Sequence, residues 1–278
     1  MRVPFAEVIG SPVGHSLSPQ IHRHWLSVLG LQGSYVATRV ESASVRAFVA
    51  ARRQDRLWRG ANVTAPHKQA VLELLDRIDH AAAEVGAVNC IYRGATGLTG
   101  ANTDLEGIGV ALADLDLAGQ PVAIIGGGGA ARAALQWLRA RGCGEVSLVL
   151  RRAEAGASMR GARAVGFDQA AQTIRTAHLT INATPLGLAG GVPMPNQLVD
   201  ALRKSEGVAA FDMVYRPLET PFLAAARENG LRVIDGLTML VGQAQRSFRL
   251  FFGSEPPVSE DAALRRMLTG APPERVGD

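Results

Sequence analysis

The chain has 278 residues, of which 47% are hydrophobic and 19% are charged, and this balance is typical of a globular protein and excludes a disordered one. The length is more than one ordinary core requires and predicts two domains. The net charge of +4 comes from 29 basic and 25 acidic residues, and the arginines are scattered without interleaved aromatic residues, so we expect small anionic ligands and no nucleic acid.

The first hundred residues alternate between strand-like and helix-like segments. Apolar residues at 6–10 and 34–38 predict two strands, and the segments near 19–29 and 68–85 predict two helices. We therefore expect a smaller α/β domain at the N-terminus.

A run of glycines follows the next strand. Residues 121–125 form a short apolar segment that ends in four glycines, and residues 130–138 have helical composition and spacing. A further apolar strand is expected at 145–150, at the distance that a right-handed βαβ crossover requires.

The remainder of the chain continues this alternation. Further strands are expected at 179–182, 208–212 and 231–235. With the helical stretches between most of them, they complete a doubly wound parallel sheet. From Leu237 the chain is helical, with an apolar face that we expect to pack back on the first domain. The predicted fold is α/β, with one domain of residues 1–103 and 237–278 and a doubly wound (Rossmann) domain of residues 104–236.

Lysine is almost absent, because Lys68 and Lys204 are the only lysines among the 29 basic residues. An Arg guanidinium stays protonated at any working pH, whereas burial and neighbours can tune a Lys ammonium until it gives up its proton. Lys68 ends the segment Asn62-Val63-Thr64-Ala65-Pro66-His67-Lys68 and is therefore our candidate for proton transfer. The alternative interpretation is that Lys68 has no catalytic role and remains by chance in an Arg-rich protein.

Two serines stand at the start of the first predicted helix. Ser16 and Ser18 precede Pro19, a residue that favours the first helical turn. Only one hydroxyl can cap a helix, so the second can meet a ligand carboxylate near the positive end of the helix dipole.

Other polar residues of the first domain belong to the amide, hydroxyl, ammonium and carboxylate classes. In chain order they are Asn62, Thr64, Lys68, Asn89 and Asp104. With the two serines they predict a site for a small polyhydroxylated acid. His15 and His67 are expected to be structural neighbours of this site rather than its base.

The glycine turn predicts the cofactor. The pattern Gly126-x-Gly128-x-x-Ala131 lies between a strand and a helix inside a βαβ unit, which is the context of a dinucleotide site. An NAD enzyme places Asp or Glu after the second strand, whereas this chain has Arg151 and Arg152, which can bind a 2′-phosphate. We therefore predict that the protein binds NADP(H) in preference to NAD. The alternative interpretation is that the two arginines only mark the end of a strand and bind no cofactor.

Eight motifs follow one another along almost the whole chain. They are Ser16 to Pro19, Asn62 to Lys68, Gly86 to Asn89, Asn102 to Asp104, the glycine loop, Asn182 to Gly187, Asp212 to Pro221, and Gly236 to Gln243. In order and spacing they resemble the shikimate dehydrogenase family. The resemblance implies NADPH-linked reduction of 3-dehydroshikimate to shikimate, a step of chorismate and aromatic amino acid biosynthesis. It also implies a cleft between an N-terminal substrate domain and the Rossmann domain.

The same resemblance implies a role for each site residue. Lys68 and Asp104 would form the catalytic pair. The substrate residues would be Ser16 and Ser18 on the carboxylate, Thr64, Asn89, Asp104 and Gln243 on the hydroxyls, and Tyr215 facing the ring. The cofactor residues would be Gly126, Gly127, Gly128, Gly129, Ala130, Arg151, Arg152, Thr184, Met213 and Gly236.

The chain departs from the family pattern at three places. Leu150-Arg151-Arg152 stands where the family often has Asn-Arg-Thr, Cys90 where Thr is usual, and Thr238 where Gly is usual. These changes bear on cofactor affinity, closing motion and substrate range. A quinate or aminoshikimate dehydrogenase of the same superfamily and a non-catalytic NADP-binding sensor are the alternative functions.

The remaining expectations concern location and partners. No apolar segment has membrane-spanning length, and the N-terminus lacks the apolar stretch of a signal peptide. Cys90 and Cys143 lack the spacing of metal ligands. We therefore expect no metal and no membrane partner, a cytoplasmic location, and a monomer or homodimer that binds small molecules.

Overall fold

The computed structural model describes residues 3–153, 159 and 161–270, and the chain divides into two compact units. Unit 1 consists of Met1–Thr103 and Gln243–Asp278, and unit 2 consists of Asp104–Gly242. The second boundary was expected after Gly236, whereas this division falls inside helix α9 (Gly236–Phe252).

Unit 1 contains a mixed sheet, with six strands among the residues described. Their order is β2 (Ser34–Arg39), β1 (Phe5–Gly10), β3 (Trp58–Val63), β5 (Cys90–Gly94), β6 (Gly97–Ala101) and β4 (Arg77–Ile78). Strand β1 is parallel to both of its neighbours, whereas β5 is antiparallel to β3 and to β6. Sequence analysis predicted only β1 and β2 of this sheet.

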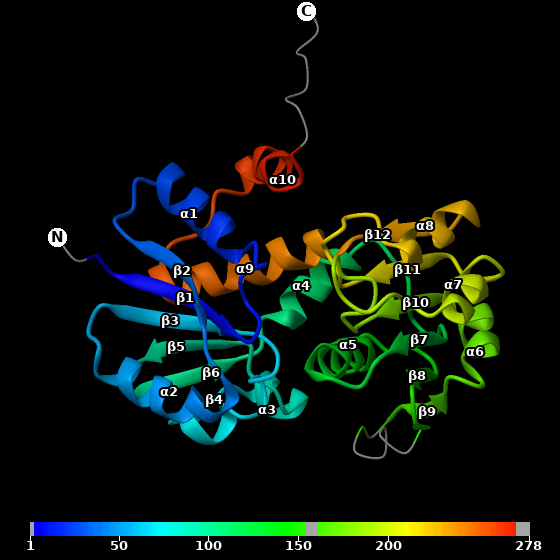
Figure 1. The fold of residues 1–278 in the computed structure, drawn as a ribbon, viewed down its shortest axis with the longest axis horizontal. Coiled ribbons are helices and arrows are strands. Elements are labelled where there is room, and N and C mark those ends of the chain that lie inside the picture. The colour runs from blue at the N-terminus through cyan, green and yellow to red at the C-terminus, as the bar shows by residue number, and fades with distance from the viewer. Residues whose placement is uncertain (1–2, 154–158, 160, 271–278) are drawn as a thin grey trace, which may run out of the picture. The chain divides into compact units, whose positions relative to one another are not determined.

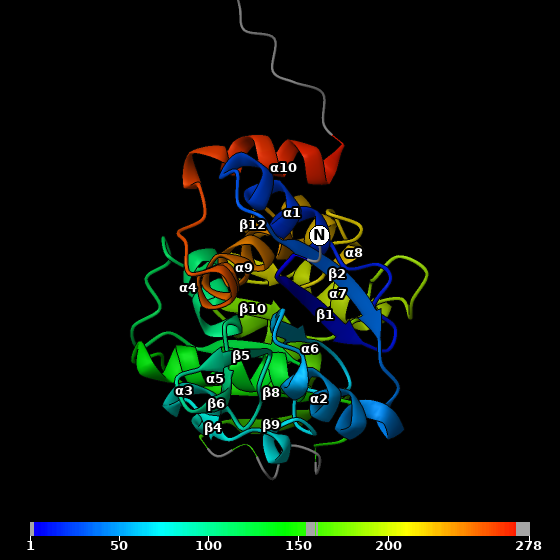
Figure 2. The ribbon, with the colours of Figure 1, turned by 90° about the vertical axis from the view of Figure 1, so that its left-hand side faces the viewer.

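Helices cover both faces of the unit 1 sheet (Figure 1). Helices α2 (Val45–Gln54) and α3 (His80–Val85) pack on the face of Ile9, and helices α1 (Ser18–Val28) and α9 pack on the other face. Helix α10 (Asp261–Thr269) lies beside α1 in both views (Figures 1 and 2). The short 3-10 turns are η1 (Ser42–Ser44), η2 (Leu72–Leu74) and η4 (Val258–Glu260).

The single helix expected near 68–85 is wrong. The segment contains η2, then the short strand β4, and only then α3. Two aspartates divide it, because such side chains bond nearby backbone groups and favour turns and caps over helix interiors. Asp76 accepts a hydrogen bond from the Leu98 backbone N–H at 2.7 Å, and Asp79 caps α3 by accepting one from the Ala82 N–H at 2.7 Å.

Unit 2 is the expected doubly wound sheet. Within the described residues its six parallel strands have the order β12 (Arg232–Ile234), β11 (Ala209–Asp212), β10 (Leu179–Asn182), β7 (Val122–Ile125), β8 (Val146–Leu150) and β9 (Arg163–Gly166). The chain starts in the middle, builds outward to β9, and then returns to β10 beside β7. This reversal is the topological switch point at which open α/β sheets bind their ligands.

Helices cover both faces of this sheet as well. Helix α5 (Gly129–Ala140) lies on one face and contacts α4 (Asp104–Ala111) (Figure 1). Helices α6 (Ala170–Thr176), α7 (Asn196–Leu202) and α8 (Pro221–Glu228) share one apolar core on the other face. Because both faces are covered, β7, β8, β10 and β11 are buried throughout, and apolar residues occur on both sides of each strand.

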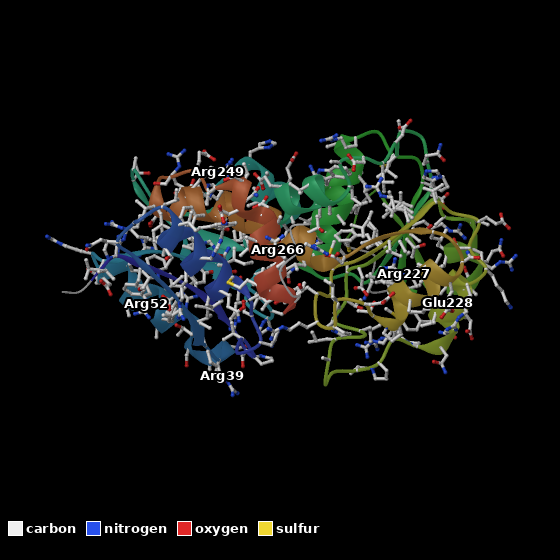
Figure 3. The ribbon with its side chains drawn as sticks, turned by 90° about the horizontal axis from the view of Figure 1, so that it is seen from above. Arg39, Arg52, Arg227, Glu228, Arg249 and Arg266 are labelled. Carbon is white, nitrogen blue, oxygen red and sulfur yellow. The ribbon has the colours of Figure 1, made fainter. Side chains whose placement is uncertain are left out.

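The arginines are distributed over separate elements of the two units (Figure 3). Arg227 and Arg249 form exposed ion pairs with Glu219 and Glu255, both at about 3 Å. Arg52 instead bonds the buried carboxylate of Glu7 at 2.7 Å. Among the described helices, none combines the length and apolar character needed to cross a membrane.

Candidate active site

The loop after β1 carries the two serines. Helix α1 begins at Ser18, one residue earlier than expected, and its N-cap position is Leu17, which provides no side-chain cap. The Ser16 hydroxyl accepts a long 3.3 Å bond from the Ser18 backbone N–H. Neither serine is therefore the side-chain cap that was expected of one of them from the sequence.

The loop after β3 lies against the loop after β1. The Ser11 N–H donates to the Ala65 carbonyl at 3.2 Å, and the Thr64 N–H donates to Ile9 at 2.9 Å. A Cβ atom at Gly10 would stand 2.4 Å from the Thr64 Cγ2, so only glycine fits there. The segment of Thr64 and the segment that leads to Ser16 are thus held together at one end of the sheet.

The Lys68 turn is tied to the turn of Asn89. The Val88 N–H donates to the Lys68 carbonyl at 2.8 Å, and the Val63 N–H donates to the Asn89 carbonyl at 2.7 Å. His67 is buried and its Nε2 lies 2.6 Å from the Val40 carbonyl, in agreement with the structural role expected for it. The structure thereby brings together the segments of Thr64, Lys68 and Asn89.

Thr103 joins two predicted substrate residues. Its backbone N–H donates to Asn89 Oδ1 at 2.6 Å, and its hydroxyl lies 3.1 Å from Asn89 Nδ2. The same hydroxyl donates to Gln243 Oε1 at 3.2 Å. Asn89 and Gln243 are far apart in the sequence, yet Thr103 hydrogen-bonds to the side-chain amides of both. No role was predicted for Thr103 from the sequence.

Tyr35 and Ser247 were also missed. The Tyr35 hydroxyl donates to Asn62 Oδ1 at 2.7 Å, and Asn62 Nδ2 donates to the Ser247 Oγ at 2.7 Å. Tyr35 was indistinguishable from an ordinary apolar strand residue. For Ser247 a signal existed, because it follows Gln243 by one helical turn and must share its helix face.

Other predicted residues belong to unit 2. Asp104 is buried at the first position of α4, and the half-buried Tyr215 follows β11. Lys68 belongs to unit 1. The catalytic pairing of Lys68 with Asp104 therefore joins residues of two units and stays a prediction.

The glycine loop connects β7 to α5. Gly126 has a φ of 117°, a conformation that favours glycine, and a Cβ there would stand 2.7 Å from the Thr184 Cγ2. Gly128 is the N-cap of α5 without a side-chain cap, and apart from its chain neighbours no group of the described residues lies within 4 Å of the position of a Cβ on it. The first turn of α5 has no acidic residue.

These features fit a dinucleotide pyrophosphate. The first N–H groups of a helix have no partner within the helix, and the helix dipole makes this end positive. The open space over Gly128 lets an anion approach those groups. Arg151 and Arg152 are exposed directly after β8, at the same edge of the parallel sheet. Gly127, Gly129 and Ala130 complete the loop.

Asn182 organises the turn that carries Thr184. Its Oδ1 accepts bonds from the Thr184 hydroxyl at 2.7 Å and from the Thr184 N–H at 3.1 Å. Its Nδ2 donates to Asp212 Oδ1 at 2.8 Å, which links the ends of β10 and β11. Thr184 is thus held at the carboxyl edge of the sheet, beside the glycine loop.

Asp212 is a fully buried carboxyl group, and sequence analysis assigned it no role. It accepts bonds from Asn182, from the Val214 N–H at 2.9 Å and from the Thr220 hydroxyl at 2.6 Å. Burial raises the pKa of Asp212 to about 6, although its three donors oppose the shift. The carboxyl group fixes the start of the segment that contains Met213 and Tyr215.

Gly236 packs directly on that segment. A Cβ at Gly236 would stand 2.5 Å from the Met213 carbonyl oxygen and 2.7 Å from that of Val214, so a larger residue has no room. The structure thereby brings together Met213 and Gly236, two of the residues expected to line the nicotinamide.

Comparisons with known proteins agree on one family. The model of the shikimate dehydrogenase substrate binding domain matches residues 8–91, and that of the shikimate 5'-dehydrogenase C-terminal domain matches residues 236–262. A shikimate dehydrogenase (NADP(+)) of Sphingopyxis alaskensis is 42% identical, over 95% of this chain and 97% of that protein. One from Mesorhizobium japonicum is 38% identical, over 95% of each.

A solved structure shows the same similarity. The shikimate 5-dehydrogenase of Thermus thermophilus in complex with NADP(H) and shikimate is 37% identical to this chain. The similarity has a TM-score of 0.82 and covers 95% of this chain and 99% of that one.

Proposed function

The chain belongs to the shikimate dehydrogenase family, and on that premise we propose that it catalyses the reversible, NADPH-dependent reduction of 3-dehydroshikimate to shikimate. One observation within the molecule carries the proposal. The segments of Thr64, Lys68 and Asn89 are bonded to one another in unit 1, and the loop of Ser16 lies against them. Hydroxyl, amide and ammonium groups in one place suit a small polyhydroxylated acid.

Unit 1 supplies most of the substrate contacts in this proposal. Ser16 and Ser18 bind the carboxylate beside the start of α1, where no acidic residue opposes an anion. Thr64, Asn89 and Gln243 bind the ring hydroxyls, and Thr103 holds the last two amides in their orientation. From unit 2, Asp104 binds a hydroxyl and Tyr215 faces the ring.

Unit 2 binds the cofactor, which supplies the hydride when it is bound. The glycine loop and the uncapped start of α5 receive the pyrophosphate. Arg151 and Arg152 bind the 2′-phosphate of the adenosine ribose. Thr184, Met213 and Gly236 line the nicotinamide at the carboxyl edge of the sheet.

Lys68 handles the proton in this mechanism. As the ketone carbon is reduced, its oxygen gains negative charge, and the Lys68 ammonium donates a proton to that oxygen or stabilises it as an alkoxide. In the reverse direction Lys68 accepts the hydroxyl proton. Asp104 orients Lys68 and binds the neighbouring hydroxyl.

A steady-state assay of the wild-type protein tests the proposal. We expect oxidation of shikimate with NADP+, much slower turnover of quinate, and weaker use of NAD+. Turnover of quinate at a comparable rate would favour the quinate or aminoshikimate alternative. Binding of NADP+ without turnover of any of these acids would favour a sensor.

Lys68→Ala separates chemistry from binding. We expect kcat to fall by about two orders of magnitude or more, with a much smaller change in shikimate binding, because a positioned acid acts mainly on the transition state. A normal kcat with a raised KM would contradict this role. Lys68→Arg keeps the charge but cannot lose a proton, so partial rescue would identify an electrostatic role.

The proposal extends to partners and location. Small molecules are the partners, the cell compartment is the cytoplasm, and the pathway is chorismate biosynthesis. Light scattering of the purified protein distinguishes the monomer from the homodimer, and cell fractionation tests the location.

A further inference from the structure

Asn182 and Asp212 form a buried polar pair at the carboxyl edge of the unit 2 sheet. They are the last residues of β10 and β11, they face each other in the register of these strands, and each is 0% exposed. Asn182 Nδ2 donates to Asp212 Oδ1 at 2.8 Å. Strand β10 also pairs with β7, which leads into the glycine loop, so the pair lies one strand away from that loop.

The partners of the Asn182 side chain determine which way its amide points. An ionised carboxylate can only accept hydrogen bonds, so the amide turns its NH2 group toward Asp212 and its oxygen away. The Leu186 carbonyl, 3.1 Å from Asn182 Nδ2, is an acceptor as well and requires the same orientation. Asp212 is itself held by the Val214 N–H at 2.9 Å and by the Thr220 hydroxyl at 2.6 Å.

The oxygen of the amide in turn holds Thr184. Asn182 Oδ1 accepts bonds from the Thr184 hydroxyl at 2.7 Å and from its N–H at 3.1 Å, and the Leu186 N–H donates to the hydroxyl at 3.2 Å. Since a hydroxyl has one proton, this one cannot donate to a ligand and offers only an acceptor lone pair or the neighbouring methyl group. That methyl group packs on the glycine loop, 2.7 Å from the position of a Cβ on Gly126. The bond to Asn182 thereby holds the Thr184 side chain in one orientation.

From this pair we propose that Asn182 and Asp212 are positioning residues for the nicotinamide ring, which they hold for hydride transfer through Thr184. The inference rests on the proposed function, because that function places Thr184 against the nicotinamide. Since both side chains of the pair are fully buried, they act through Thr184 and not by contact with the cofactor.

Three variants test the pair. Asn182→Ala removes the direct bond to Thr184 and leaves Asp212 with two donors, so it tests the inference even if Asp212→Ala does not fold. Asp212→Ala removes the acceptor that orients the amide. Asp212→Asn keeps an oxygen for Asn182 and the Val214 N–H, and its NH2 group can donate to the Thr220 hydroxyl oxygen. This conservative variant should therefore keep the amide in its orientation.

Asn229→Ala is the matched control in the same unit. The Asn229 side chain donates to the Leu202 carbonyl at 3.1 Å and to the Ser205 carbonyl at 2.8 Å. Both partners precede β11 in the chain, so this amide lies at the amino edge of the sheet, away from Thr184. Its loss should destabilise unit 2 without moving the turn that carries Thr184.

The measurements separate the two ends of the cofactor. The inhibitor 2′,5′-ADP carries the adenosine and the 2′-phosphate but has no nicotinamide, so its inhibition constant reports the adenosine end alone. The kinetic isotope effect on kcat, with shikimate deuterated at the carbon that loses the hydride, reports the transfer step. The melting temperature reports the stability of each variant.

Asn182→Ala and Asp212→Ala should each lower kcat about tenfold, because a loosely held nicotinamide reaches the transfer geometry less often. The isotope effect should rise, since hydride transfer becomes slower relative to product release. The inhibition constant of 2′,5′-ADP should stay unchanged, and Asp212→Asn should keep most of the wild-type kcat. Asn229→Ala should lower the melting temperature and change neither kcat nor the isotope effect.

Other results overturn the inference. If the alanine variants bound 2′,5′-ADP more weakly in step with kcat and showed an unchanged isotope effect, the pair would serve only the core of unit 2. A kcat of Asp212→Asn as low as that of Asp212→Ala would show that hydrogen-bond geometry is not the cause. An unchanged kcat in the alanine variants of an active enzyme would overturn the inference and leave the proposed function standing. A wild-type protein that does not oxidise shikimate with NADP+ would overturn both.

Discussion

The two units hold their strand ends with different chemistry. In unit 1 the buried line of Tyr35, Asn62 and Ser247 consists of neutral hydroxyls and an amide. In unit 2 the corresponding task falls to a buried carboxyl group, Asp212, which bonds Asn182 and Thr220. The hydroxyl and amide groups of the unit 1 network carry no charge in the pH range in which carboxyl groups titrate, whereas a network built on a carboxyl group changes when that group titrates.

Burial also gives the units opposite responses to acid. His22, which stacks on Tyr35, is fully buried, and burial lowers its pKa to about 3. Among the described residues neither of its ring nitrogens has a hydrogen-bond partner. Burial instead raises the pKa of Asp212 to about 6. In each case desolvation disfavours the charged form, but the charged form appears at low pH for His22 and at high pH for Asp212.

The largest expected effect is the acid sensitivity that His22 gives unit 1. Because its folded pKa lies below the unfolded value of 6.5, the unfolded chain binds more protons, and stability should be lost as the pH falls from about 6.5 to about 3. The loss should approach about 5 kcal/mol. His22→Phe should remove it, as measured by peptide-resolved hydrogen exchange at several pH values.

His80→Gln serves as the control for His22, because the His80 side chain is 88% exposed. If the stability of unit 1 depended on pH in the same way in the wild type and in His22→Phe, the proposed effect of His22 would be contradicted.

Comparison of the wild type with Asp212→Asn should show that Asp212 gives unit 2 the opposite dependence of stability on pH. The folded pKa of Asp212 lies above the unfolded value of 3.8, so the folded state holds the extra proton, and stability should fall as the pH rises from about 4 to about 6. The loss should be about 3 kcal/mol. The Asn variant should abolish this slope in peptides from β10 and β11, whereas Asp200→Asn, at an exposed position of α7, should retain it. Equal slopes in both variants would show that Asp212 does not titrate in this range.

Charge also distinguishes ligand recognition in the two units. The Arg151→Ala, Arg152→Ala double variant should lose about two orders of magnitude in NADPH affinity, since charge-assisted bonds to a 2′-phosphate are removed. NADH affinity should hardly change, and the wild-type preference for NADPH should shrink as salt is raised. Arg227→Ala, on the exposed surface of α8, is the control (Figure 3). Parallel losses of kcat/KM for both cofactors would mean that the two arginines support the fold.

The smallest expected effect concerns a neutral group of unit 1. Ser16→Ala should raise the KM for shikimate by about tenfold, because one hydrogen bond to a carboxylate is lost. Salt should change this factor less than it changes the arginine effect, since a hydroxyl has no net charge. If the KM for shikimate and the KM for its methyl ester rose equally, Ser16 would support the structure of the loop and would not bind the carboxylate.

Sequence analysis predicted unit 2 better than unit 1. Strands β7, β8, β10, β11 and β12 were located within a residue or two, and all of them except β12 are buried on both faces, which favours apolar residues on both sides of the strand. In unit 1, β3, β5 and β6 and helix α2 were missed. Strand β5 has only the short apolar stretch Cys90-Ile91-Tyr92, with Cys90 and Tyr92 in one core and Ile91 in the other, and its antiparallel pairing depends on β3 and β6.

The site residues show the same division. Local patterns identified Gly126 and Gly128, because the positive φ of the turn favours glycine at position 126 and the fingerprint leaves the helix start open at position 128. They also singled out Lys68, because its chemistry differs from that of the arginines around it. These features are encoded within a few neighbouring residues.

Only the tertiary structure decided which polar groups support the site. The hydrogen bonds that give Thr103, Tyr35 and Ser247 a role reach partners more than ten residues away in the sequence. The residues adjacent to them in the chain do not indicate these partners. Likewise, the raised pKa of Asp212 results from the burial of its carboxyl group in unit 2. Hydrogen-bond partners and desolvation are properties of packing, so they exist only after distant segments have come together.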